Sequence, residues 1–312
     1  MINNLIQNKF IINYHRISNE NIDDPLSVSI KTFENQIKLL NKEFSIVSLD
    51  KIIEKKSNNK KYLAITFDDG YKDNLFNAIP ILEKYNAPAT IYITTRFLEG
   101  KCEMWWYELK KFLGERDTIS FEFNNKHYFF NLETDSLKNK SFEKISLLFK
   151  KLKYDDQNYL LQVITNNKNR IQYRNEMLNA DDLMKIKDKT IITLGAHTHN
   201  HISLAHFDKN QCLNEIKTSK NKIENIINQK VNHFAYPYGG NEDIGNKDPD
   251  LVKSAGFTSA VTTQINLFEN YQNYLLPRIY ISEKDVGKLL ILKLSFIYKV
   301  YYFLRFRLFK FF

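Results

Sequence analysis

The chain has 312 residues, of which 43% are hydrophobic and 26% are charged, and its formal net charge is +9. This composition excludes an intrinsically disordered chain, and the length suits one large α/β domain or two smaller ones. The basic residues are spread along the chain and form no block interleaved with stacking aromatics. We therefore predict no nucleic-acid partner, whereas an anionic substrate or a membrane surface fits the charge.

The cysteines and the N-terminal residues indicate the cellular compartment in which the protein is expected. Cys102 and Cys212 lie far apart and form no CxxC pair, so they predict neither a disulfide framework nor a zinc cluster. Residues 1–10 are polar and lack the apolar core of a signal peptide. A cytoplasmic location is therefore the expectation.

Hydrophobic patterns predict alternating strands and helices along most of the chain. Apolar runs predict strands at residues 10–14, 44–47, 62–67, 89–93, 190–194, 233–236, 257–261 and 276–281. Helical spacing predicts helices at residues 29–43, 49–55, 75–85, 209–228 and 251–255, the first of them capped by Ser29 or Thr32. This order, with about seven βα units, is typical of a parallel sheet or barrel.

Residues 99–179 interrupt the alternation. Residues 120–132 alternate around Asn124-Asn125-Lys126 and predict a β-hairpin, and residues 144–164 predict one or two amphipathic helices. We interpret the segment as an insertion on the main domain and not as an independent domain.

Two adjacent carboxylates, Asp68 and Asp69, close the strand predicted at residues 62–67. Neighbouring like charges raise one pKa unless a cation intervenes, so a metal ion bound by one Asp would leave the other as a nearby base. The alternative is an ordinary turn, because Gly70 follows and Asp-Gly is a common turn pair. Barrels and open α/β sheets place their sites at such strand ends.

A histidine cluster at residues 197–201 follows the strand predicted at residues 190–194. His197 and His201 are four residues apart, so on a helical turn both imidazoles would lie on one face and could bind one ion. The alternative is a polar surface loop. His199 is expected to point elsewhere.

Asp69, His197 and His201 together would form a site with two histidines, one carboxylate and open positions for water and substrate. Non-haem iron oxygenases use the same ligand types, so the ligand set alone does not separate oxidation from hydrolysis. The second carboxylate, Asp68, favours hydrolysis because a hydrolase needs a base. Residues 234–239, with aromatics, Pro and Gly, could line a sugar pocket or form an ordinary loop.

These motifs, in this order and each at a strand end, resemble the NodB-homology polysaccharide deacetylases (carbohydrate esterase family four). The likeness also includes Tyr14-His15-Arg16 and Leu276-Pro277-Arg278, and residues 99–179 are its loosest part. It implies a distorted (β/α)7 barrel over residues 1–285. It also implies a divalent metal ion, with zinc as the default and cobalt, nickel or iron as alternatives.

The resemblance assigns a role to each matching residue. Asp68 would be the general base, and the metal ligands would be Asp69, His197 and His201. The backbone N–H of Tyr238 would help to hold the oxyanion.

The sequence departs from the family pattern in two places. Ala235 replaces the arginine that orients the base, and Arg278 is the expected substitute. The late histidine that acts as general acid is also missing. His15 matches a subset of the family with this acid near the N-terminus, and a hydrogen-bonded strand-end histidine is the alternative.

The implied reaction removes an N-acetyl group from an amino sugar of a polysaccharide or lipid-linked glycan. Removal of a formyl group from a formamido sugar and O-deacetylation are variants of it. A carbohydrate-binding relative without activity is a different alternative, motivated by Ala235 and the missing histidine. The sequence makes no prediction of oligomeric state.

Residues 286–312 are rich in Leu, Ile, Phe and Tyr but are interrupted by Lys and Arg. No uncharged run approaches the ~20 residues needed to span a bilayer. A basic helix with aromatics predicts contact with a membrane interface, which at the cytoplasmic face would suit a lipid-linked sugar. A terminal helix packed on the barrel or on a second subunit is the alternative.

Overall fold

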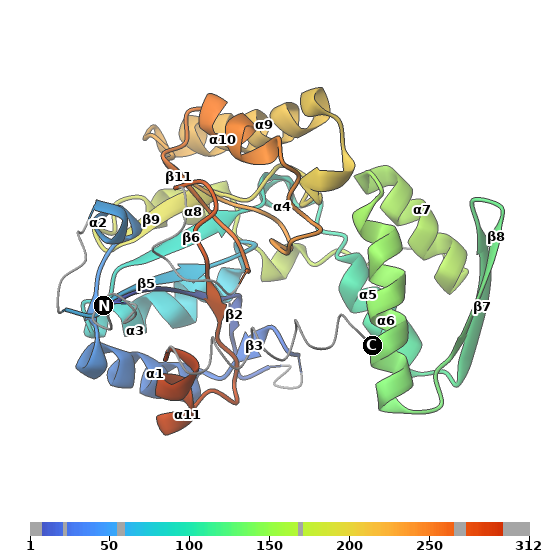
Figure 1. Ribbon diagram of the computed structural model, residues 1–312, viewed down its shortest axis with the longest axis horizontal. Helices are drawn as coiled ribbons and strands as arrows, with labels where there is room; N and C mark the ends of the chain where they lie inside the picture. Colours follow the sequence, from blue (N-terminus) through green and yellow to red (C-terminus); the bar gives the residue numbers. More distant parts are fainter. Residues whose placement is uncertain (1–7, 21–23, 55–59, 168–170, 265–272, 296–312) are drawn as a thin grey trace, which may run out of the picture.

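The computed structural model describes residues 8–20, 24–54, 60–167, 171–264 and 273–295. Figure 1 shows a curled sheet with helices packed around it and a separate lobe beside it. The main path of the sheet runs in the order β11-β10-β9-β6-β5-β1-β12. The strands on this path are β1 (Lys9–Tyr14), β5 (Tyr62–Phe67), β6 (Ala89–Ile93), β9 (Ile192–Ala196), β10 (His233–Ala235), β11 (Ser259–Val261) and β12 (Ile279–Tyr280).

Every strand pair of this sheet is parallel, including the pairing of β4 (Ser45–Ile46) with the start of β5. An isolated parallel bridge joins Val261 at the end of β11 to Leu276, shortly before β12. The two ends of the strand path therefore meet. The expectation of a distorted (β/α)7 architecture is confirmed, and it brings the carboxyl ends of the strands to one rim.

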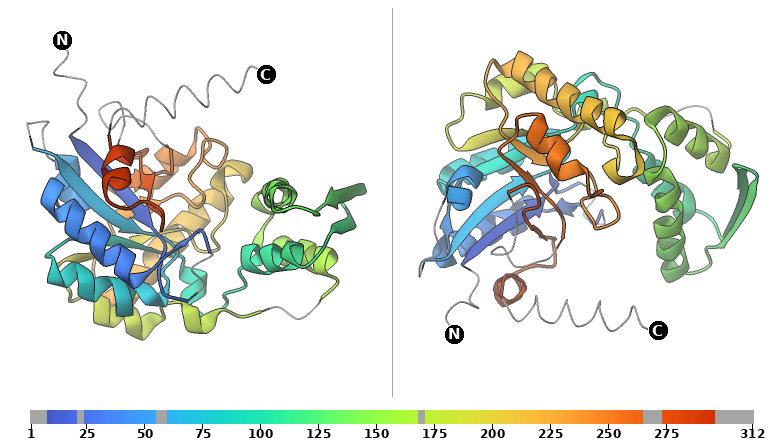
Figure 2. Two further views of the ribbon diagram at one scale, coloured as in Figure 1. Left: turned by 90° about the horizontal axis from the view of Figure 1, so that it is seen from below. Right: turned by 45° about the horizontal axis from the view of Figure 1, so that its top comes forward.

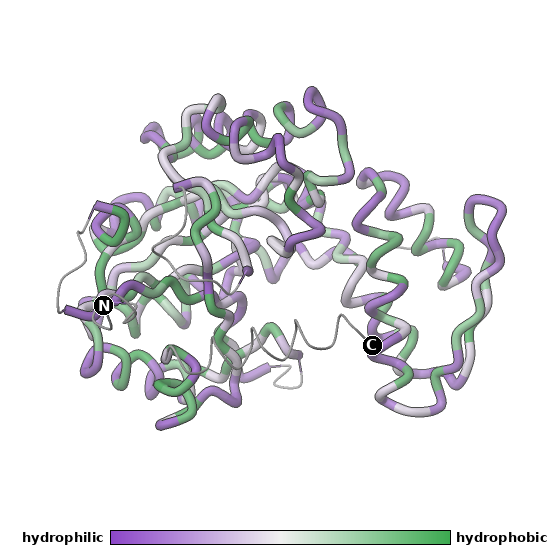
Figure 3. The backbone as a smooth tube through the Cα atoms, viewed as in Figure 1, coloured by the Kyte–Doolittle hydropathy of each residue, from purple (hydrophilic) through white to green (hydrophobic). Residues whose placement is uncertain are grey.

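Amphipathic helices cover the outside of the sheet. Helix α1 (Ile30–Glu43) buries Phe33, Ile37 and Leu40 on one face, and the Ser29 hydroxyl caps it by accepting from the Thr32 N–H. Figure 3 shows the same alternation of polar and apolar residues along the other long helices. The remaining helices of the barrel are α2 (Leu49–Glu54), α3 (Ile79–Lys84), α4 (Thr95–Leu98), α8 (Ala180–Ile186), α9 (Lys209–Ile227), α10 (Asp248–Ser254) and α11 (Lys288–Lys293).

The helix expected at residues 75–85 is split in two. Residues Asn74–Ala78 form a π-helical turn, η2, in which the Ile79 N–H donates to the Asn74 carbonyl, and α3 begins at Ile79. Pro80 has no N–H to donate and its ring crowds the preceding turn, which accounts for the wider turn before it. Short elements complete the barrel: β2 (Arg16–Ile17), β3 (Ser27–Val28), and the 3₁₀ turns η3 (Arg174–Glu176) and η4 (Leu204–His206).

Residues 105–165, within the segment expected to be inserted, form the lobe seen beside the sheet in Figures 1 and 2. It consists of α5 (Trp105–Gly114), the hairpin β7 (Thr118–Phe123) and β8 (Lys126–Asn131), α6 (Asp135–Lys150) and α7 (Tyr154–Thr165). Its hydrophobic cluster is distinct from those of the barrel, and within it Trp105 stacks on Phe149 with ring centroids 4.3 Å apart.

The hairpin predicted in this lobe is confirmed. Asn124 and Asn125 both have positive φ, as a two-residue turn of type I′ requires. The start predicted for the helical part, residue 144, is wrong, because α6 begins at Asp135 after the Thr134 cap. The polar residues of its first turns hide the helical period from a pattern based on apolar spacing.

Candidate metal centre

The predicted site residues come from several strand ends that meet at one rim of the barrel. Asp68 and Asp69 follow β5 directly, and His197 follows β9. The chain turns sharply after β5, where Asp69 and Gly70 both have positive φ. A Cβ at position 70 would lie 3.0 Å from the Ile93 side chain, so glycine suits this turn both in conformation and in space.

The structure brings Asp69, His197 and His201 together as a buried group. Asp69 Oδ1 lies 3.4 Å from His197 Nε2 and 3.3 Å from His201 Nε2. Ligand atoms that each lie about 2.0–2.1 Å from a tetrahedral zinc ion are about 3.4 Å apart. The three atoms therefore have the chemistry and the spacing to hold one divalent ion.

Hydrogen bonding prepares His197 for this role. Its Nδ1 lies 2.8 Å from the Ala235 carbonyl, which can only accept, so Nδ1 carries the proton and Nε2 presents a lone pair toward Asp69. Burial acts to raise the pKa of Asp69, but its interactions with His197 and His201 outweigh burial and hold that pKa well below its usual value. Asp69 is therefore an ionised ligand at neutral pH.

The helical turn predicted for the histidine pair is wrong. The residues from His197 to His201 form no helix, and Thr198 and His201 both have positive φ. Glu215 of α9 stabilises this loop by accepting the backbone N–H groups of His199 and Asn200. A loop reversal, and not a shared helical face, places the two imidazoles beside Asp69.

His199 lies apart from the ligand atoms. Its Nδ1 is 2.9 Å from the Thr95 hydroxyl at the start of α4. Burial and the nearby positive charge of Lys222 lower the pKa of His199 to about 4, so the ring is neutral at physiological pH.

Asp68 is held by a buried arginine. Arg278 donates to both carboxylate oxygens of Asp68 at 2.7 Å, and Asn13 donates to the second oxygen at 2.9 Å. Burial acts to raise the pKa of Asp68, but the positive charge and hydrogen bonds of Arg278 outweigh burial and hold the pKa below its usual value. The structure therefore places the Arg278 guanidinium directly against the Asp68 carboxylate.

Asn13 is a site residue that the sequence reasoning missed. It contacts three groups around the base: its amide donates to Asp68, and its oxygen accepts from Arg278 and Thr66. Its signal in the sequence was a polar residue inside an otherwise apolar strand, at residues 10–14.

His15 follows β1 and stands near the carboxylate pair. Its electrostatic interaction with them is among the lesser causes that lower the pKa of both Asp68 and Asp69. Its Nδ1 is buried without a hydrogen-bond partner among the residues described, and its ring lies 5.8 Å from that of Tyr280. The ring is close enough to act on the site electrostatically and retains an unused nitrogen.

Aromatic rings from both parts of the molecule surround His201. Tyr238, in the loop after β10, lies 4.8 Å from the His201 ring between centroids, and Trp106 of the inserted lobe lies 5.3 Å away. Tyr238 has positive φ, as does Gly239, where a Cβ would lie 2.7 Å from the Thr263 nitrogen. The contribution of Trp106 was not predicted, because nothing in its local sequence relates it to residue 201.

Comparison with known proteins gives relatives of this architecture. A family model described as polysaccharide deacetylase matches residues 55–260. YxkH of Bacillus subtilis (strain 168), which carries a polysaccharide deacetylase name, is 34% identical over 110 residues. That alignment spans 32% of this chain and 37% of YxkH, so it covers little more than a third of the relative's length.

Solved structures resemble most of the chain at low sequence identity. The Streptococcus pyogenes deacetylase PplD, in complex with acetate, has a TM-score of 0.60 at 19% identity and covers 91% of this chain and 96% of its own. A de-N-acetylase from Aggregatibacter actinomycetemcomitans has a TM-score of 0.58 at 15% identity and covers 91% and 98%. These likenesses establish the fold. The matched family model shows that this chain belongs to the polysaccharide deacetylase family.

Proposed function

We propose that this protein is a metal-dependent hydrolase that removes the acyl group, acetyl in the first instance, from an N-acylated amino sugar. One observation carries the proposal: a buried Asp69–His197–His201 group lies beside a second buried carboxylate, Asp68, that an arginine holds ionised. Family membership supports the same chemistry. An oxygenase would have no evident use for the base.

A divalent ion held by Asp69, His197 and His201, with zinc as the first candidate, would supply Lewis acidity and a water of lowered pKa. Asp68 accepts the proton of the attacking water. Arg278 fixes the direction in which the Asp68 oxygens point and keeps them unprotonated until that transfer.

Two further residues complete the proposed reaction. The backbone N–H of Tyr238 donates to the oxyanion of the tetrahedral intermediate, and a well-placed donor of this kind contributes about 3–4 kcal/mol. His15, with its unused Nδ1, protonates the departing sugar amine. The products are a carboxylate, acetate in the first instance, and a free amino sugar.

Release of the acyl group tests the function directly. Purified full-length protein, with its metal content measured, is incubated with a panel of N-acetylated glycans. We expect acetate release that stops on chelation and returns on addition of zinc, cobalt, nickel or iron. A metal-loaded protein that releases no acid from any N-acylated or O-acylated sugar, yet binds the glycan, would instead support the carbohydrate-binding alternative.

The same assay separates the variants of the reaction. Formate released from a formamido sugar identifies a deformylase, and acid released from sugar esters identifies an O-deacetylase. We place the N-acetyl substrate first because the family is named for deacetylation.

We propose that residues 1–285 form one barrel unit with residues 99–179 inserted, and that residues 286–312 contact the inner face of a membrane. In the described part, α11 and the residue that follows it bury Leu290 and Leu294 against the barrel, and α11 exposes Leu289 by 60% and Leu292 by 48%. Residues 296–312, which carry much of the predicted amphipathic segment, lie outside the described residues.

No helix among the described residues is long and apolar enough to cross a bilayer. The contact that we propose is peripheral. We expect the full chain to co-sediment with anionic liposomes and a chain ending at residue 285 to remain in the supernatant. Equal sedimentation of the two chains would contradict the membrane proposal and favour helix packing on the barrel.

A further inference from the structure

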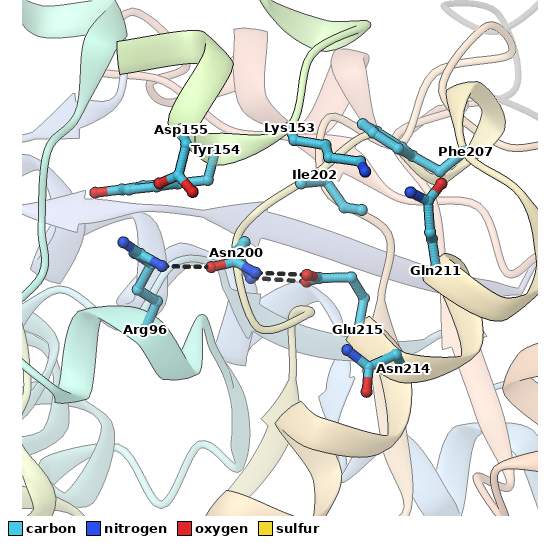
Figure 4. Close-up of a pocket in the computed structure, with 10 residues that line it drawn as sticks. All are labelled: Arg96, Lys153, Tyr154, Asp155, Asn200, Ile202, Phe207, Gln211, Asn214 and Glu215. Carbon is cyan, nitrogen blue, oxygen red and sulfur yellow. Dashed lines mark hydrogen bonds between the residues drawn. The ribbon is translucent and has the colours of Figure 1, made fainter. Parts of the chain in front are cut away.

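A pocket lies where the inserted lobe meets the barrel (Figure 4). It is separate from the metal centre, because none of its lining residues is a candidate metal ligand. Its volume is ≈ 240 Å³, below the roughly 300–1,000 Å³ of drug-sized sites, so it suits a single ring. The lobe contributes Lys153, Tyr154 and Asp155 from the start of α7, and the barrel contributes residues that include Asn200 and Gln211. We propose that this pocket binds one neutral sugar ring.

The charge of the lining points to a neutral ligand. Two cationic side chains, Arg96 and Lys153, are balanced by two anionic ones, Asp155 and Glu215. An anionic ligand such as a phosphate would meet both carboxylates, and a cationic ligand would meet both basic groups. A ligand that carries hydroxyl groups can instead donate to the carboxylate and accept from the cation in one pose.

Several polar groups of the lining are free to bind such hydroxyls. Among the residues described, Lys153 Nζ and the Asp155 carboxylate make no ion pair or hydrogen bond, and Arg96 Nε is buried without a partner. The Gln211 side-chain oxygen accepts from the Asp208 N–H, which leaves the Gln211 NH₂ group available. Lys153 and Asp155 are exposed, whereas Arg96 and Gln211 are half-buried, and the unpartnered donors of these half-buried side chains favour a ligand that satisfies them.

The half-buried Phe207 provides a ring face for a sugar, whereas Tyr154 is buried and Arg96 covers one of its faces. Tyr154 and Phe207 line the pocket from the lobe and from the barrel, and the Arg96 guanidinium lies 3.5 Å from the centroid of the Tyr154 ring. Figure 4 shows the Lys153 amino group and the Gln211 amide on the Phe207 side. Apolar faces with a few placed polar groups are the usual composition of a small-molecule site.

The pocket is connected to the loop that carries the histidines. Asn200 accepts from Arg96 at 3.1 Å and donates to Glu215 at 2.5 Å, and it directly precedes His201 (Figure 4). A sugar that contacts Arg96 therefore acts on the same hydrogen-bond network that holds the metal-site loop. The ring could be a free monosaccharide or one unit of a glycan whose acyl group reaches the metal site.

Sugar binding by the full chain tests the proposal without any need for hydrolysis. Glucose and N-acetylglucosamine are titrated by saturation-transfer-difference NMR into the wild type and into Lys153→Met and Gln211→Glu. Gln211→Glu retains an oxygen for the helix cap but removes the NH₂ donors. We expect the Kd to rise about fivefold to tenfold in each variant, the loss of one hydrogen bond to a ligand. Asp69→Ala should bind as the wild type does, which separates this proposal from the hydrolase.

Matched surface changes control for charge and fold. Lys151→Met and Gln229→Glu alter exposed residues that do not line the pocket and should leave Kd unchanged. If longer oligosaccharides bind more tightly than monosaccharides, and Lys153→Met abolishes that gain, the pocket binds one unit of the substrate glycan. Equal binding at every length would identify a free monosaccharide. Absence of sugar binding, or a Kd that neither pocket substitution changes, would overturn the proposal.

Discussion

The barrel and the inserted lobe differ in what they bury. The barrel buries charged side chains at the rim of its strands, among them Asp68, Asp69 and Arg278. Within residues 105–165, all of which the structure describes, no charged side chain is buried, and the lobe core consists of rings and aliphatic groups around Trp105 and Phe149. Burial of a charge costs free energy unless it is paired, so such charges are retained where they have a partner or a task.

This difference divides two roles: the barrel supplies the groups that react, and the lobe shapes the surface that contacts the glycan. The proposed reaction uses groups of the barrel alone. The lobe places Trp106 beside His201 and supplies part of the lining of the proposed sugar pocket. Substitutions at the rim should therefore change metal retention and turnover. Substitutions in the lobe should change which glycans bind and how strongly.

The largest effect is expected from Asp69→Ala. This change removes the carboxylate that lies within 3.4 Å of both imidazoles, so metal retention and acyl release should fall together below detection. Elemental analysis and product release on the same sample measure both. Asp117→Ala, an exposed carboxylate of the lobe, should leave both unchanged. Full metal content in Asp69→Ala would remove this residue from the ligand set.

Asp68→Asn should separate turnover from metal retention. The amide retains the size of the side chain but cannot accept the proton, so kcat should fall about 10²–10⁴-fold while metal content stays at the wild-type level. Steady-state kinetics with elemental analysis checks both. Near-normal turnover would contradict the assignment of Asp68 as the base.

Asp68 contributes to the free energy of unfolding, and this contribution depends on pH. Arg278→Met should reverse the direction of that dependence. In the wild type the pKa of Asp68 is held below its usual value, so its contribution is complete above that value and is lost as pH falls through the lowered pKa. In the variant, burial dominates and the pKa rises above the usual value. The contribution of Asp68 is then retained in acid and is lost as pH rises through the raised pKa.

The deficit of Arg278→Met should therefore be largest near neutral pH, at about 3–5 kcal/mol, and should shrink toward pH ~4. Denaturant unfolding at several pH values measures it. Arg116→Met removes an exposed arginine 3.7 Å from Glu115 and should cost less than about 1 kcal/mol at every pH. A deficit that does not vary with pH would show that Arg278 acts through packing alone.

The sequence could predict the parts of the site whose residues lie close together in the chain. Asp68 with Asp69, and His197 with His201, follow recognisable strands, and parallel order brings such strand ends to one rim. Arg278 was expected only through the resemblance, because 210 positions separate it from Asp68.

The rest depends on backbone and contacts that local patterns do not encode. The left-handed conformation of Thr198 and His201 is uncommon for residues other than glycine, so the spacing suggested a helical turn instead. Asn13 meets Asp68 across 55 positions, and Trp106 meets His201 from an inserted segment. Only the folded sheet and lobe bring these pairs together.

The smallest effect, and the one that tests the lobe, is expected from Trp106→Ala. The indole is half-buried, lies 5.3 Å from the His201 ring and has an Nε1–H without a partner among the described residues, so it can contact a bound substrate. Loss of an aromatic contact of about 0.5–1.5 kcal/mol should lower kcat/KM by up to about tenfold, mainly through KM, with metal content unchanged. Trp106→Phe keeps a ring and should recover most of the loss. If Trp106→Ala instead released the metal or left KM unaltered for every glycan, the lobe would support the loop of His201 and not the substrate. The division of roles between the barrel and the lobe would then be wrong.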